Sequence, residues 1–174
     1  IEELFFKNPN KEYHVRNIAK LLGISPTSAS KYLKDLENKK IIFSEKKYGH
    51  LIFRANTESK EYKVEKRNHN IKSLYDTGLI ESLVKEFNHP EAIVLFGSYS
   101  KAEDNEGSDI DTLIISPLKK ELNLEKFERK LNRKIQLFTV SKEEFKKTNK
   151  NLKNNWINGI VLEGYIEIWR FYKK

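Results

Sequence analysis

The hydrophobic pattern of the first third of the chain predicts two helices followed by a β-hairpin. Before Gly23, which ends the run, apolar residues recur at the spacing of one helix face: Val15, Ile18, Leu21 and Leu22. A Ser-Pro pair at 25–26 supplies an N-cap and a proline at the first helical position, so a second helix is expected from there to about Asn38. Apolar runs at 41–43 and 51–54 predict two strands, and Gly49 lies in the turn between them.

The apolar pattern of the remaining chain predicts a second, mixed helix and strand region. Residues 58–70 are polar and charge-dense, so we interpret them as a linker that is partly helical. Three short apolar runs predict buried strands: 93–96, 113–115 and 135–140. Helices are expected before, between and after them: from Ile71 to a point before Pro90, at about 122–131, and from a capping box at Ser141. We expect the aromatic tail, residues 156–172, to pack on this region, with a homodimer interface as its second possible role.

These elements predict an α+β protein of two domains. The expected boundaries are 1–57 for the first domain, 58–70 for the linker and 71–174 for a domain with a mixed sheet packed by helices. The chain has no cysteine, which excludes a disulfide scaffold and thiolate metal sites. It has no apolar run near the length of a membrane span, so the cytoplasm is the expected location.

The net charge of +8 is concentrated toward the first domain, whose second helix presents a polar and basic face. The residues we expect to meet double-stranded DNA lie on the two helices and in the hairpin: Arg16, Thr27, Ser28, Ser30, Lys31, Lys34, Lys46 and Lys47. The order of helices and hairpin in residues 1–57 resembles a winged helix domain, whose second helix enters the major groove. Winged helices also serve as protein-interaction modules, and that alternative stays open.

One motif of the second domain carries chemistry. Gly97-Ser98 follows the first buried strand, ten residues intervene, and Asp109-Ile110-Asp111 opens the next strand. Side chains two residues apart in a strand share a face, so the two carboxylates are expected side by side. Paired carboxylates suit Mg²⁺, which also recruits substrate phosphates, and Gly97 lets the backbone approach a phosphate closely.

Gly97-Ser98, the ten-residue gap and Asp109-x-Asp111 between two apolar strands resemble the signature of the DNA polymerase β-like nucleotidyltransferase superfamily, in its minimal branch. The resemblance implies a two-metal Mg²⁺ site on Asp109 and Asp111, with Gly97 and Ser98 on the phosphates of a nucleoside triphosphate such as ATP. Lys101 is a candidate for a further phosphate contact, or else an exposed loop lysine.

The chain departs from the family at two positions. Ala102 stands where the family usually has glycine, and Gln136 stands where the resemblance implies a third carboxylate. An amide can neither accept a proton nor bind a cation as an anion does, so the second metal is expected to be weakened. Two functions remain open. One is a nucleotidyltransferase acting on an unidentified acceptor, for which a protein is one candidate. The other is a DNA-binding transcriptional regulator with a catalytically weak or inactive nucleotide-sensing domain.

Overall fold

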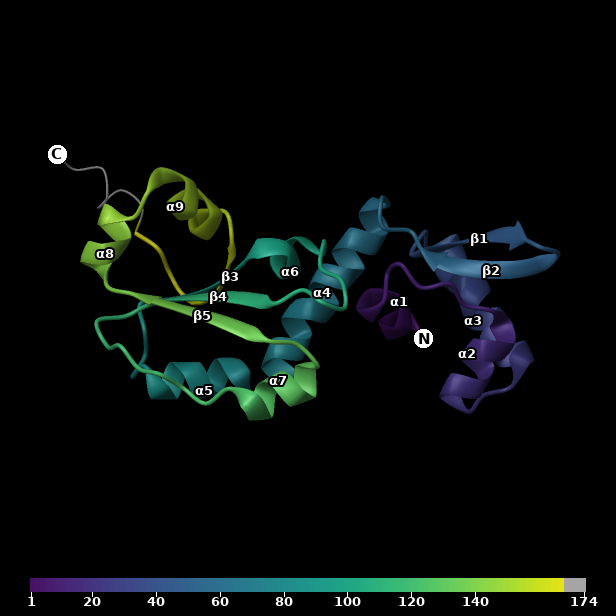
Figure 1. Ribbon diagram of the computed structural model, residues 1–174, viewed down its shortest axis with the longest axis horizontal. Helices are drawn as coiled ribbons and strands as arrows, with labels where there is room; N and C mark the ends of the chain where they lie inside the picture. Colours follow the sequence, from purple (N-terminus) through teal and green to yellow (C-terminus); the bar gives the residue numbers. More distant parts are fainter. Residues whose placement is uncertain (168–174) are drawn as a thin grey trace. The chain divides into compact units, whose positions relative to one another are not determined.

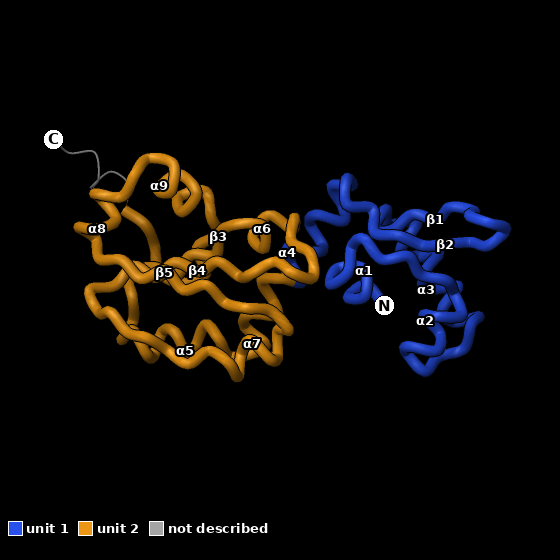
Figure 2. Tube along the Cα trace, in the orientation of Figure 1, with its two compact units in different colours: residues 1–69 blue, residues 70–174 orange. Residues whose placement is uncertain are grey.

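The computed structural model describes residues 1–167 and divides the chain into two compact units, residues 1–69 and 70–174 (Figure 2). The division falls between His69 and Asn70, inside helix α4 (Lys60–Asp76). The stretch expected as a partly helical linker, 58–70, is therefore helical from Lys60 onward. Residues 168–174, the end of the aromatic tail, lie outside the described part. No helix within residues 1–167 combines the length and apolarity of a membrane span.

The first unit is built from three helices and a two-stranded hairpin. Helices α1 (Glu2–Lys7), α2 (Val15–Leu22) and α3 (Pro26–Asn38) precede strands β1 (Ile42–Lys47) and β2 (His50–Ala55). The predicted start of α3 is confirmed, because Ser25 Oγ accepts a hydrogen bond from Ser28 N at 3.0 Å and Pro26 occupies the first turn. Gly23 ends α2 in the left-handed conformation, as its position suggested.

The core of the first unit is formed by one face of each helix together with the hairpin. Leu33 is fully buried and Tyr32 is exposed, so the helix turns its leucine and not its tyrosine inward. Leu21 and Leu22, expected to face the core, are exposed, while Ile18 and Ala19 are the buried residues of α2. Other buried members of this core come from α1, the hairpin and α4: Phe5, Ile42, Phe53 and Tyr62.

The second unit is a four-stranded mixed sheet with helices on both faces. Its strands are β3 (Ala92–Phe96), β4 (Ile110–Ile115), β5 (Ile135–Val140) and β6 (Ile160–Gly164), in the spatial order β5-β4-β3-β6. Strand β3 pairs antiparallel with β4 and β6, and β4 pairs parallel with β5. The three strands expected from the apolar runs are confirmed, as is the mixed sheet.

Alternation along the strands sorts the core into two layers (Figure 1). Even positions of β4, such as Ile110 and Ile114, face the layer of α4, α5 (Leu79–Glu86) and α7 (Glu125–Leu131). Odd positions, such as Leu113 and Ile115, face α8 (Lys142–Lys147) and α9 (Lys150–Ile157). The capping box at Ser141 that opens α8 is confirmed.

One expected helix is in fact two. The apolar spacing from Ile71 to Phe87 predicted a continuous helix, but α4 ends at Asp76 and α5 begins at Leu79. Gly78 lies between them with φ 76°, a left-handed conformation that glycine adopts without strain. The break lets Leu74, Leu79 and Leu83 all reach the same layer of the core.

Candidate functional site

The turn from β3 into α6 (Gly97–Lys101) brings the backbone of Gly97 against the carboxylate of Asp111. Phe96 and Asp111 are partners in the antiparallel register, so the turn begins directly beside that side chain. Gly97 has φ 73°, and a Cβ built on it would collide with Asp111 Oδ2. Both the backbone conformation and the close approach therefore require glycine at this position.

Asp109 and Asp111, which we call the Asp pair, lie at the start of β4. Both are partly buried, and the odd-position face that carries Leu113 also carries Asp111. Burial raises the pKa of Asp111 above its ordinary value, and the nearby charge of Asp109 raises it further. The two carboxylates are therefore close enough to repel each other, which is the situation that a bound cation relieves.

Gln136 completes this edge of the sheet. It pairs with Asp111 in the parallel register of β4 and β5, and its Nε2 donates a hydrogen bond to Asp109 Oδ2 at 2.5 Å. Within residues 1–167, no three His, Cys, Asp or Glu side chains gather as a metal-binding group. The protein ligands that this edge offers a cation are thus the Asp pair, with an amide beside them.

The other residues expected to contact phosphate differ in their exposure to solvent. Ser98 is half-buried in the first turn of α6, whereas Lys101 is exposed at its end. Ala102 follows with φ 59°, the left-handed conformation, and its N–H caps the helix on Ser98 O. The position where glycine was expected thus keeps a conformation that favours glycine while carrying alanine.

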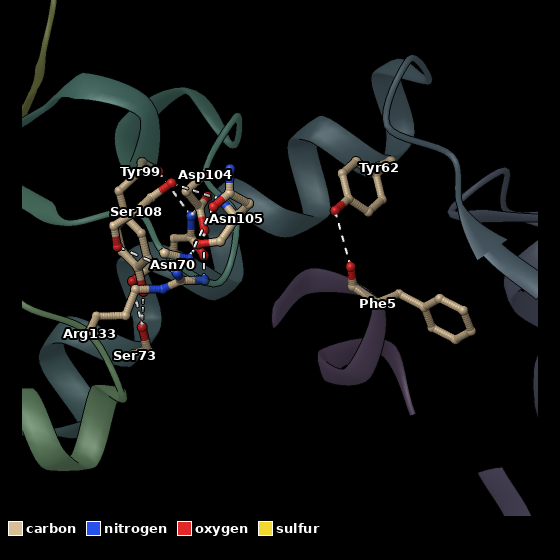
Figure 3. Close-up of polar contacts among 10 residues, drawn as sticks. Phe5, Tyr62, Asn70, Ser73, Tyr99, Asp104, Asn105, Ser108 and Arg133 are labelled. Atoms are coloured by element: carbon tan, nitrogen blue, oxygen red, sulfur yellow. Dashed lines mark hydrogen bonds and ion pairs between the residues drawn. The ribbon is translucent and has the colours of Figure 1, made fainter. Parts of the chain in front are cut away.

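The loop between α6 and β4 contains a buried acid that the sequence analysis did not single out. This residue, Asp104, is 2% exposed. Its Oδ1 accepts a hydrogen bond from Asn70 Nδ2 at 2.9 Å, and its Oδ2 pairs with Arg133 Nη2 at 3.2 Å (Figure 3). No local pattern in the sequence marks these three residues, which come from α4, the loop after α6 and the connection between α7 and β5.

An open hollow on the side of α7 borders Asp109 but not Asp111. Three cations line it, and each is paired with a carboxylate: Arg129 with Glu125 at 2.7 Å, Arg133 with Asp104 at 3.2 Å and Lys134 with Glu128 at 2.9 Å. The hollow leaves Asp109 open to solvent.

In the first unit, most of the candidate DNA-contacting residues are exposed. These are Arg16, Thr27, Ser28, Ser30, Lys31, Lys34 and Lys46. Ser28 is partly committed to the helix cap, because its hydroxyl accepts a hydrogen bond from Ser25 Oγ at 2.9 Å. Lys47 is half-buried and held by Glu12 Oε1 at 2.9 Å, a partner that also binds Arg54. Sequence reasoning missed both Glu12 and Arg54.

Comparison with known proteins identifies the second unit. Residues 77–162 match the family model for the nucleotidyltransferase domain. A crystal structure from Sulfolobus solfataricus, of a protein provisionally assigned as a nucleotidyltransferase, is 18% identical. The match covers 60% of this chain and 92% of that one, with a TM-score of 0.36. No curated protein matches the chain. Residues 77–162, the segment that contains both the Gly97 turn and the Asp pair, are therefore similar to the nucleotidyltransferase domain.

Proposed function

We propose that the second unit binds a nucleoside triphosphate with Mg²⁺ and transfers a nucleotide to an acceptor. The observation that carries this proposal is the close approach of Gly97 to Asp111, which places the backbone turn directly beside one carboxylate of the Asp pair. The pKa of Asp111 is raised by burial and by Asp109, so the Asp pair gains from a cation that neutralises it. The donor set therefore fits Mg²⁺, which prefers carboxylate oxygens and phosphate co-ligands.

Each residue has a distinct role in this proposal. Asp109 and Asp111 hold the cation, while Gly97 and Ser98 orient the triphosphate through the backbone and hydroxyl of the turn. Lys101 is exposed at the end of α6, where it contributes charge to an approaching triphosphate. When bound, Mg²⁺ would neutralise phosphate charge and align an acceptor hydroxyl with the α-phosphate.

The acceptor side is the weaker half of the site. Gln136 lies next to the Asp pair and cannot take a proton from an acceptor hydroxyl. A second candidate function follows from this observation. In it, the domain binds the triphosphate and transfers slowly or not at all, so that it senses nucleotide for a DNA-bound regulator.

We propose that the first unit is a winged helix domain that binds duplex DNA. The exposed residues of α3, Thr27, Ser30, Lys31 and Lys34, supply polar and basic contacts, and Lys46 adds a charge on the hairpin. The core residues of α3 lie on the opposite face of the helix, so the exposed face is not needed for packing of the core. Phosphate contacts of this kind make affinity fall steeply with salt.

The test of nucleotide binding is calorimetry with ATP and Mg²⁺ on the parent protein and on a variant with Asp109→Asn and Asp111→Asn. The parent should bind in a Mg²⁺-dependent manner, and the variant should lose that dependence while keeping its fold. Asp35→Asn together with Asp76→Asn, two exposed positions outside the site, serves as the charge-matched control. Equal Mg²⁺-dependent binding by parent and double variant would show that the Asp pair is not the site.

Transfer itself is measured with labelled nucleotide, and a lysate of the cells in which the protein is naturally made supplies the acceptor. Incorporation of label that requires the Asp pair supports the transferase. Mg²⁺-dependent binding without incorporation supports the sensing function.

A further inference from the structure

One buried carboxylate connects the two halves of the proposed site. Asp104 accepts hydrogen bonds from Asn70 on one oxygen and from Arg133 on the other (Figure 3). The Arg133 side chain is 6% exposed and that of Asp104 is 1% exposed, so this ion pair lies in the interior. We call Asn70, Asp104 and Arg133 the Asp104 cluster.

Asn70 ties the cluster to the phosphate side of the site. Its Nδ2 atom donates to the carbonyl of Tyr99 at 2.9 Å and to Asp104 Oδ1 at 2.9 Å. The amide group has two N–H donors, which these two acceptors engage. Tyr99 lies in α6 one residue after Ser98, so the bond to its carbonyl fixes the helix that begins with Gly97.

Arg133 ties the same cluster to the metal side. Its Nη1 donates to the carbonyl of Asn105 and, at 3.4 Å, to the carbonyl of Ser108. These carbonyls bracket a turn that is closed by the bond from Ser108 N to Asn105 O at 3.1 Å. Asp109 follows directly, so the planar guanidinium holds the last turn before the first metal-binding carboxylate.

A buried ion pair is a poor device for stability alone, because the cost of removing two charges from water offsets their attraction. What Arg133 supplies here is geometry: a fixed fork that contacts one carboxylate and two carbonyls at once. Arg133 borders the hollow, but its side chain is 6% exposed and its guanidinium is engaged by Asp104 and by the carbonyls of Asn105 and Ser108. We therefore assign the Asp104 cluster a role in holding the loop and not in direct contact with a nucleotide.

We propose that Asn70, Asp104 and Arg133 are positioning residues that set the placement of Asp109 relative to the Gly97-Ser98 turn and thereby the affinity for the Mg²⁺–triphosphate complex. The proposal rests on the proposed function of the second unit. Replacing a residue that orients a metal ligand without touching the metal typically weakens metal binding by about 10–100-fold. An effect of that size is expected here.

The decisive variant replaces both charges of the pair at once, Arg133→Met with Asp104→Leu in the full chain. Replacing both partners by apolar residues of similar volume is often neutral for stability, whereas removing one leaves a buried charge. The variant should therefore unfold near the parent's midpoint, yet bind Mg²⁺–ATP about 10–100-fold more weakly by calorimetry. Arg129→Met is the matched control, because Arg129 lines the same hollow but is exposed and paired with Glu125 on α7.

A second readout does not depend on nucleotide. Amide hydrogen exchange across residues 103–109 should accelerate in the double variant and stay unchanged in the Arg129→Met control. If the double variant does not fold, Arg133→Lys takes its place. A single ammonium cannot reproduce the planar fork, so faster exchange and weaker binding are again expected.

The outcomes distinguish failure of the positioning role from failure of the proposed nucleotide-binding function. Parent-like exchange and parent-like binding in a folded double variant, or in Arg133→Lys, would overturn the positioning role. A parent protein that shows no Mg²⁺-dependent nucleotide binding would overturn the proposed function. In that case, the exchange rates would still decide whether the Asp104 cluster holds the loop.

Discussion

Gln136 donates its side-chain amide to Asp109 Oδ2 at 2.5 Å, across the parallel pair formed by β4 and β5. The amide thus occupies a coordination direction of one carboxylate of the Asp pair. A carboxylate at the same position would repel the Asp pair in the free protein and attract a second cation in the bound one. We therefore expect the residue at 136 to influence both metal occupancy and proton transfer in the proposed site.

We predict that Gln136→Asp or Gln136→Glu increases nucleotide transfer. The new carboxylate would supply both a general base, typically worth about 10²–10⁴-fold, and a further metal ligand. The measurement is labelled-nucleotide transfer at several Mg²⁺ concentrations, with Gln136→Leu as the control that removes the amide without adding charge. Robust transfer by the parent that is unchanged or lowered in the Asp variant would contradict this account.

Gly97→Ala should abolish Mg²⁺-dependent nucleotide binding and destabilise the fold. The left-handed conformation costs a non-glycine residue about 1–2 kcal/mol, and the added Cβ also collides with Asp111. Gly78→Ala is the control, since Gly78 has φ 76° but a Cβ there meets no atom within 4 Å. Both variants should lose stability by denaturant unfolding, and only the first should also lose binding. Equal binding by the two variants would separate Gly97 from the site.

Asp111→Asn should stabilise the metal-free protein at pH values above the pKa of Asp111. Burial and the charge of Asp109 raise the pKa of Asp111 above 3.8, so its contribution to stability is fully present below that ordinary value. The contribution is lost as pH rises through the raised value. The unfolding midpoint of the parent minus that of Asp111→Asn should therefore fall as pH rises through this window. Added Mg²⁺ should reduce the loss in the parent alone.

The same pH series contains an opposite trend, which the subtraction removes. Hydrogen bonds from Lys119 and from the backbone of Ser141 lower the pKa of Glu144 to about 2. Its contribution to stability is present above the ordinary value of 4.5 and is lost as pH falls toward 2. Both proteins contain Glu144, so its effect cancels when the two unfolding midpoints are subtracted. A difference that grew with rising pH would show that the ionised carboxylate of Asp111 does not destabilise the folded protein.

Glu12→Gln should strengthen binding of the full chain to duplex DNA. Glu12 pairs with Lys47 at 2.9 Å and also with Arg54, so it neutralises charge on the hairpin. Its removal should free Lys47 for a phosphate and steepen the log–log salt dependence by about 0.9. Lys46→Ala, which removes an exposed charge, should make the dependence shallower by about one contact. The check is fluorescence anisotropy over a salt series. Absence of duplex binding at low salt would favour a protein-interaction module.

Ala102→Gly should stabilise the protein by about 1 kcal/mol, because Ala102 holds a left-handed conformation that glycine adopts freely. Denaturant unfolding measures the gain. Ala92→Gly, at a buried strand position, is the control and should destabilise. A loss of stability at position 102 would mean that packing of the alanine methyl outweighs its backbone strain.

The local parts of this fold could be predicted from the sequence because their determinants lie within a few residues. The Ser25 cap and the Ser141 capping box were found because each uses a partner three residues away. Strands β3 and β4 were found because the apolar runs 93–96 and 113–115 are uninterrupted, and β5 was found although Gln136 and Thr139 interrupt its apolar run. Gly78 was missed as a helix break because the apolar spacing continues in phase on both sides of it.

The candidate site divides in the same way. The Gly97 turn and the Asp pair form a motif with a fixed spacing, and the structure brings Gly97 and Asp111 into contact. Asp104 could not be singled out, because its partners Asn70 and Arg133 lie 34 and 29 residues away along the chain. Only the folded chain brings those three together.

The dependence of residues 97–111 on Asn70 and Arg133 has a consequence for protein engineering. The segment has the appearance of a portable module: a strand end, a short helix, a loop and a strand start. Transplanted alone onto another sheet, it would leave behind the side chains that fix its loop, and it would carry a buried acid with no cation to meet it. A functional graft must therefore also transfer an amide in a preceding helix and an arginine in the connection that leads into the neighbouring parallel strand.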